Sequence, residues 1–161
     1  FAAACVAQGV QPIVGALLGI ARAGAGGDGG AGESGGEAGI DYLPLFVQEE
    51  VGWLNLCRLV SRAHLARPAD QPAHVALDDL AGLTDGLIAL TGAGEGAVTR
   101  LAARGHGDAA RTMLERLRGL FPGRLYVELA PRGDPAEEAA EPALIDLAYA
   151  LDLPLVATNP A

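Results

Sequence analysis

The strongest constraint on the fold of this chain is its alternation of short apolar runs with longer amphipathic segments. Residues 12–20, 42–47, 87–90, 124–129 and 153–157 are predicted to be strands, and residues 51–64, 97–103, 108–120 and 134–151 helices. The first of these runs is almost continuously apolar, which is typical of a parallel strand covered on both faces. The pattern therefore predicts an α/β domain in which parallel strands alternate with helices.

Shorter signals complete this outline. Residues 1–8 are predicted to form the end of a helix that stops at Gly9, residues 77–83 a short helix, and residues 91–96 a tight turn. Asp108 and Asp134 are predicted N-caps, and Pro142 should kink or restart the last helix. Residues 23–39 are predicted to be a flexible Gly-rich loop. No Lys-Ser or Lys-Thr pair follows that loop, so a phosphate cradle is disfavoured.

Composition limits the function classes. The 161 residues are 50% hydrophobic and carry a formal charge of -9, and the eleven basic residues are all scattered arginines. Duplex DNA requires clustered basic residues, so the chain alone should not grip nucleic acid. There is no apolar run of roughly 18 residues and no signal-peptide pattern. We expect a cytoplasmic protein that makes no membrane contact.

Candidate core residues follow from the helical and strand periods. Trp53 is interpreted as a core anchor rather than a ligand platform. The remaining core candidates are Leu54, Leu56, Cys57, Leu59, Val60 with Ser61, Leu87, Ile88, Leu125, Val127, Leu155 and Val156. Cys5 and Cys57 are interpreted as buried free thiols, with a disulfide or metal pair as the alternative.

The polar candidates do not form a recognisable metal pattern. The spacing of His64, His74 and His106 matches no zinc motif. Asp78 and Asp79 are adjacent on a predicted helix and point in different directions, so a role at the start of that helix suits them better.

Several stretches together resemble one family. They are Gln11–Gly15 (QPIVG), Glu50–Leu65 (EVGWLNLCRLVSRAHL), Leu80–Gly92 with its GLIALTG, Arg124–Glu128 (RLYVE) and Leu153–Asn159 (LPLVATN). In order and spacing they are similar to the N-terminal PHP domain of the alpha subunit of bacterial DNA polymerase III. The resemblance implies a distorted (β/α)₇ barrel. We expect residues 1–161 to be part of such a domain, with its first strands missing.

The resemblance also implies which positions should carry metal ligands. An intact site of this family holds two or three metal ions that activate a water and clamp a phosphodiester. The matched positions here are occupied by Leu17, Tyr42 or Leu43, Ala93, Arg132 and Pro160. We therefore expect a degenerate metal site, with no catalytic, cofactor-binding or metal-ligating residue in this chain.

These implications define the expected function. The parent protein should be a DNA-directed DNA polymerase of DNA replication, a nucleotidyltransferase whose Mg²⁺, DNA and dNTPs are bound by other domains. The present segment should be a structural module that docks the proofreading exonuclease subunit and meets other holoenzyme subunits. The alternatives are an active metal-dependent phosphoesterase or proofreading domain, and the corresponding region of an error-prone alpha-like polymerase.

Overall fold

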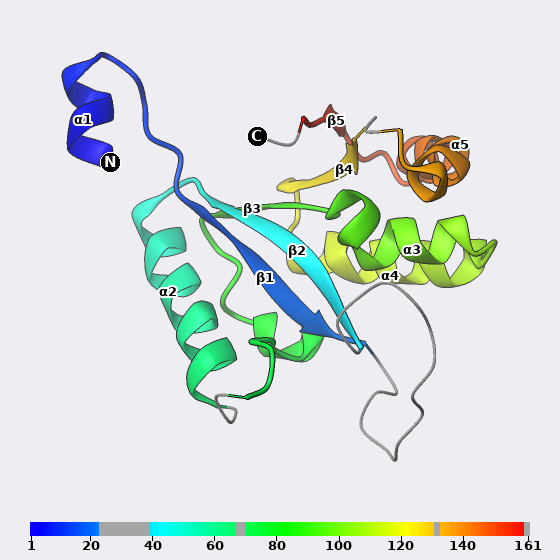
Figure 1. Ribbon diagram of the computed structural model, residues 1–161, viewed down its shortest axis with the longest axis horizontal. Coiled ribbons are helices and arrows are strands. Elements are labelled where there is room, and N and C mark those ends of the chain that lie inside the picture. Colours follow the sequence, from blue (N-terminus) through cyan, green and yellow to red (C-terminus); the bar gives the residue numbers. More distant parts are fainter. Residues whose placement is uncertain (23–38, 67–69, 131–132, 160–161) are drawn as a thin grey trace.

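A computed structural model describes residues 1–22, 39–66, 70–130 and 133–159. The predicted loop at 23–39 therefore lies, except for Gly39, outside the described residues. The elements are α1 (Ala2–Ala7), β1 (Gly15–Ala21), β2 (Ile40–Val47), α2 (Glu50–Leu65), η1 (Leu77–Leu80), β3 (Leu87–Leu90), η2 (Ala93–Glu95), α3 (Ala97–Ala103), α4 (Gly107–Leu120), β4 (Leu125–Leu129), α5 (Pro135–Ala150) and β5 (Leu155–Ala157). The α/β class is thus confirmed (Figure 1).

The five strands form one open mixed sheet in the order β1-β2-β3-β4-β5. β3, β4 and β5 are parallel, as predicted, but β2 runs antiparallel to both β1 and β3. The prediction of an all-parallel sheet is therefore wrong for the first two strands. Their apolar composition suggested burial on both faces, and the described residues do not close into a barrel.

The register of β1 and β2 shows why their apolar composition led to a wrong prediction of burial on both faces. Leu18 lies opposite Leu43, and both side chains are buried on one face of the sheet. On the other face Leu17 lies opposite Pro44 and is 54% exposed. Side chains of a strand alternate between faces, so one face of this hairpin is covered, whereas the other is open around Leu17 and buried only at its Ile40 end. We call the other side, with Leu17, Tyr42, Pro44, Phe46 and Ile88, the open face.

The edge of β1 that points away from β2 is partly free. The Gly19 carbonyl accepts from the Val75 amide, and the Ala21 amide donates to the Val75 carbonyl. Backbone groups of alternate residues point to the same edge, so those of Gly15 and Leu17 lie along it too. No described strand pairs with that part of the edge.

The core lies between the covered face and the helices. One cluster joins buried residues of the strands with those of α2, α4 and α5, among them Leu45, Leu59, Leu114, Val127 and Leu144. In Figure 1, α2 covers one end of the sheet, whereas α3, α4 and α5 gather at the other. α1 contributes no buried residue and stands apart from the sheet at the end of an extended segment.

The orientation of α2 differs from the prediction. Its buried side is formed by Gly52, Asn55, Leu56, Leu59 and Ala63. Asn55 is buried because its amide donates to the Asp85 carbonyl at 3.0 Å. The prediction took the neighbouring apolar arc as the core side.

The consequence is an apolar surface on α2. Trp53 is 48% and Leu54 51% exposed, so neither is the predicted core anchor. Cys57 is exposed and Cys5 half-buried; both are free, but neither is the buried thiol that was predicted.

Two glycines allow α2 to approach the chain before β3. An added Cβ on Gly52 would lie 1.9 Å from the Gly86 carbonyl oxygen. Gly86 itself has a φ of +70°, in the left-handed region. Its carbonyl accepts from the amides of Gln48 and Glu49 at 2.9 and 3.3 Å. The start of α2 is therefore fixed by backbone contacts that leave no room for a side chain.

Helix ends follow the sequence signals in part. Asp134 caps α5 by accepting from the Ala136 amide at 2.8 Å, as predicted. α5 continues across Pro142 as one helix. α4 begins at Gly107 with His106 as its N-cap, so Asp108 lies in the first turn instead of capping it.

The remaining strand and helix predictions need smaller corrections. The helix predicted at 77–83 is a single 3₁₀ turn that ends at Leu80. Leu87, Leu125 and Val127 are buried as predicted. Other predicted core residues are not: Leu155 is 37% exposed, and Ile88 and Val156 are half-buried.

Candidate functional site

The parallel strands end at one edge of the sheet, where the functional groups of α/β proteins usually lie. β3 ends in a turn whose Gly92 has a φ of +87°. A Cβ there would lie 2.2 Å from the Tyr42 carbonyl oxygen, and a Cβ on Gly96 would lie 1.8 Å from that of Thr91. Only glycine fits either position. The predicted tight turn is thereby confirmed, and it brings the end of β3 against β2.

Glu128 joins three strand ends at this edge. Its carboxylate accepts from the Gly92 amide at 3.1 Å and from the Thr158 hydroxyl at 2.6 Å. Its own amide donates to the Thr91 hydroxyl oxygen at 2.9 Å. The residue is 8% exposed. Because both carboxylate oxygens are occupied by the protein, Glu128 acts here as a structural tie.

A second glutamate borders a small cavity beside this tie. Glu137, on the first turn of α5, accepts from the Gly94 amide at 2.9 Å. The cavity has a volume of about 180 Å³, and its wall includes Glu128, Glu138 and the buried Thr99. Within the described residues the Thr99 hydroxyl has no partner, and a water would satisfy it. The acidic wall disfavours phosphate.

The structure places three of the five matched ligand positions. Leu17 lies on the open face, and Tyr42, paired with Gly19, lies on the same face. Leu43, the alternative to Tyr42, is 3% exposed on the opposite, covered face. Ala93 is buried in η2. Arg132 and Pro160 lie outside the described residues.

The side chains at these positions do not fit a metal centre. Leu17 and Ala93 have no donor atom, and a tyrosine hydroxyl is neutral near pH 7. Within residues 1–22, 39–66, 70–130 and 133–159, no group of three or more His, Cys, Asp or Glu side chains could hold a metal ion.

The histidines and adjacent aspartates are spread over the surface. His64 lies in the last turn of α2, His106 precedes α4, and His74 has its Nδ1 2.8 Å from the Pro72 carbonyl oxygen. Asp79 accepts from the Ala76 amide at 2.9 Å, which is the helix-start role predicted for it. Asp78 is exposed and bonds Arg116 at 2.7 Å.

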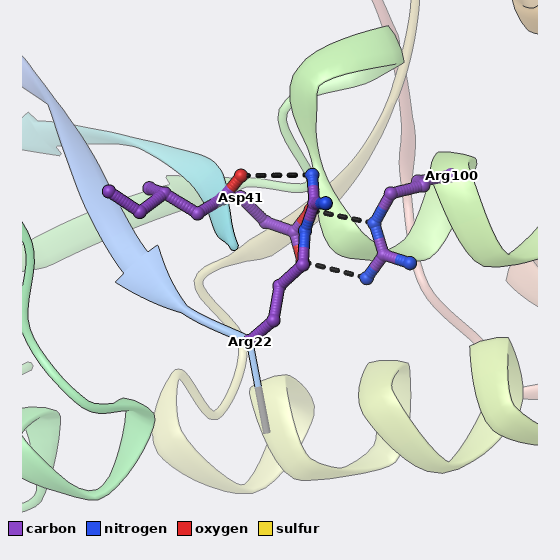
Figure 2. A network of polar contacts seen from close by, with 4 residues as sticks. Arg22, Asp41 and Arg100 are labelled. Carbon is purple, nitrogen blue, oxygen red and sulfur yellow. Dashed lines mark hydrogen bonds and ion pairs between the residues drawn. The ribbon is translucent and has the colours of Figure 1, made fainter. Parts of the chain in front are cut away.

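The structure contains a buried charge network that the sequence analysis did not predict (Figure 2). The Asp41 side chain is 5% exposed and accepts from Arg100 Nε at 2.7 Å and Nη2 at 2.8 Å. Arg22 Nε donates to the same carboxylate at 2.8 Å, and its Nη2 donates to the Ile40 carbonyl at 3.0 Å. The hydrogen bond that Arg100 donates to Asp41 raises the pKa of Arg100, as does the negative charge of Asp41, while burial opposes both. The signal available was an aspartate at the start of an apolar strand.

Comparisons of the sequence with known proteins point to one family. A sequence model described as "PHP domain" matches residues 1–132. DNA polymerase III subunit alpha of Caulobacter vibrioides is 39% identical over 151 residues, 94% of this chain and 13% of that protein. The error-prone DNA polymerase of Symbiobacterium thermophilum is 36% identical over 166 residues, 94% of this chain and 14% of that protein.

A third relative extends the comparison. DNA polymerase III subunit alpha of Escherichia coli K12 is 32% identical over 120 residues, 74% of this chain and 10% of that protein. The chain therefore spans only a small part of the length of these relatives. In the described part of the chain, no helix has the length and apolar character needed to cross a membrane.

Proposed function

The chain belongs to the PHP domain family, and from this premise we propose that it is the PHP region of a bacterial DNA polymerase III alpha subunit, where it serves as a structural domain without metal chemistry. The parent is a replicative DNA-directed DNA polymerase of the cytoplasm. Its Mg²⁺-dependent nucleotidyl transfer, DNA and dNTPs belong to other domains. Within this chain no residue is assigned a catalytic, cofactor-binding or metal-binding role.

One observation carries the proposal that the domain is not catalytic. The positions that the resemblance matches to metal ligands hold Leu17, Tyr42 or Leu43, and Ala93. Two of these side chains offer no lone pair, and a di- or trinuclear site needs several anionic or imidazole donors at short distance. The nearby carboxylate of Glu128 is already committed to Gly92 and Thr158.

The open face supports a barrel that this chain forms only in part. Leu17 and Ile13 expose 54% and 68% of their surface on or beside β1. Part of the outer edge of β1 has no described strand partner. Exposed apolar residues and a free edge together favour pairing with further strands. We propose that other strands of the parent protein complete a distorted (β/α)₇ barrel here.

The apolar surface of α2 supports docking of a partner subunit. It consists of Val51, Trp53, Leu54 and Cys57, of which the first three expose 43%, 48% and 51% of their surface. Exposed clusters that include tryptophan are typical of interaction surfaces. We propose that the proofreading exonuclease subunit of the holoenzyme docks on this surface of α2.

Metal analysis tests the non-catalytic proposal. The full-length protein should contain no stoichiometric zinc or manganese by elemental analysis. It should also fail to hydrolyse bis(p-nitrophenyl) phosphate, because Leu17 and Ala93 supply no ligand for a metal ion. Stoichiometric metal that is lost together with a phosphodiesterase activity would contradict the proposal and favour an active phosphoesterase or proofreading domain.

A binding comparison tests the docking proposal. Trp53→Ser and Leu54→Ser in the full-length protein should each weaken association with the exonuclease subunit by tenfold or more. Truncation of a central interface residue costs about 2 kcal/mol of binding free energy. Tyr149→Ser is the matched control, because Tyr149 is a 77% exposed aromatic on α5, outside this surface. Equal binding by all three variants would place the docking surface elsewhere.

The error-prone relative favours a second candidate parent. Its identity of 36% over 94% of this chain is close to the 39% of the replicative relative. The same structural role then belongs to a damage-tolerance polymerase. Primer extension past an abasic site by the full-length protein separates the two, because a replicative enzyme should stop there.

A further inference from the structure

A second cavity is larger than the one beside Glu128. Its volume is about 480 Å³, and it opens between the end of the β1–β2 hairpin, η1, α3 and α4. Its wall includes Ile20, Asp41 and Leu43, whose side chains belong to the covered face. Tyr42 and Ala21, which belong to the other face of the hairpin, also border it, so the cavity lies at the end of the hairpin beside the helices. Its size is that of a small-molecule site.

The inner wall of this cavity carries a net positive charge. Asp41 is shared by the guanidinium groups of Arg22 and Arg100, so one of the two positive charges is not neutralised within the trio. The two arginine side chains are only 30% and 20% exposed. In the described part of the chain, Nη1 of neither arginine has a hydrogen-bond partner. A half-buried excess charge of this kind is stabilised by an anion.

A third arginine on the cavity wall forms only an exposed ion pair. Arg116 bonds Asp78 at 2.7 Å, but the two side chains are 49% and 90% exposed. Exposed ion pairs contribute only about 0–1 kcal/mol, so an incoming anion can compete for this guanidinium at little cost. Beside the arginines the wall is apolar, with Leu77, Leu101, Met113 and Leu117.

We propose that this cavity binds a small organic anion, in which a phosphate monoester or carboxylate meets Arg22, Arg100 and Arg116 and a planar or apolar body contacts Leu101 and Met113. Guanidinium groups bind both kinds of anion through paired N–H donors. The inference does not rest on the proposed structural role, because none of the three arginines stands at a position matched to a metal ligand.

Four small molecules test whether binding needs both the anionic group and the apolar body. Their binding to the full-length protein is measured by calorimetric titration and by ¹⁵N–¹H spectra. Phenyl phosphate and phenylacetate carry an apolar body with each anion, benzyl alcohol lacks the anion, and inorganic phosphate lacks the body. At least one aromatic anion should bind at least tenfold more tightly than both inorganic phosphate and benzyl alcohol. The preferred aromatic anion identifies the headgroup. Absence of such a preference would overturn the proposal.

Variants locate the binding. Arg116→Ala should weaken the better aromatic anion about twofold to fivefold, in line with an exposed charge contact. Met113→Trp should block binding by filling the cavity. Arg111→Ala is the control, because Arg111 is on the same helix but pairs with Glu115 at the surface. If Arg111→Ala and Arg116→Ala weaken binding equally, or if Met113→Trp binds like the wild type while its melting temperature is unchanged, the site is not this cavity.

Discussion

Replacement of Gly52 by alanine should destabilise α2, although alanine is the better helix former. The added Cβ would lie 1.9 Å from the Gly86 carbonyl oxygen and 2.4 Å from its carbonyl carbon. Both partners are backbone atoms, so no rotamer change relieves the contact. The helix would have to move by about 1 Å before the shorter distance reached even 3.0 Å, the lower limit for real Cβ contacts.

The magnitude follows from three contributions. Overpacking of this kind costs typically about 1–3 kcal/mol. A shift of α2 also strains the hydrogen bond from Asn55 to the Asp85 carbonyl, which contributes about 1 kcal/mol. The better helix propensity of alanine offsets about 0.5–1 kcal/mol of this cost. The free energy of local opening of α2 should therefore fall by about 2 kcal/mol.

Hydrogen exchange of the full-length protein measures this change locally. Amides in the first half of α2 should exchange about 30-fold faster in Gly52→Ala, since about 1.4 kcal/mol corresponds to a factor of ten. The control is Gly119→Ala in α4, where an added Cβ meets nothing within 4 Å. That variant should be neutral or slightly protective. Unchanged protection of α2 in Gly52→Ala would refute the argument from close backbone approach.

Further predictions follow from burial, capping and exposure. Leu87→Ala should cost about 2–5 kcal/mol because its side chain is fully buried, and Ile88→Ala on the open face should cost clearly less; equal losses of melting temperature would contradict the assigned faces. Asp134→Ala should cost about 1 kcal/mol through loss of the α5 cap, detected as faster exchange in the first turn of α5. Cys57 should react with iodoacetamide in the folded protein, and protection of its thiol would show that a partner covers α2. The isolated chain, with its charge of -9, should bind primed DNA weakly even at low salt, and a sub-micromolar affinity with a steep salt dependence would contradict this.

The strands and helices themselves could be predicted from the sequence because their apolar periods are strong and their ends are marked. The signals that located β3, β4 and α5 were local: a short apolar run, a Pro-Gly turn and the Asp134 cap. Strand direction could not be predicted, because an apolar run does not specify which way its neighbour points.

The face of α2 could not be predicted for a different reason. Apolar residues occur around most of this helix, and the two that decide its orientation, Gly52 and Asn55, are not apolar. One is buried by close backbone contact and the other by a hydrogen bond to Asp85, and neither effect appears in a hydrophobic pattern.

The candidate site, too, could be predicted from the sequence only in part. The proposal that Leu17 and Ala93 replace metal ligands rests on comparison with a family motif, position by position. The trio of Arg22, Asp41 and Arg100 brings together residues that are 19 and 59 positions apart, so only the fold reveals it.

The order of the strands also has a consequence for how the chain acquires its structure during synthesis. Each strand lies beside the one that precedes it in the sequence, from β1 to β5. A strand that leaves the ribosome therefore finds its partner already made, and β1, β2 and α2 can assemble before β4 exists. Sheets whose neighbours are sequential keep contacts local and shorten the search for native pairing. Nascent chains of this kind expose unpaired strands for less time, which reduces their tendency to aggregate.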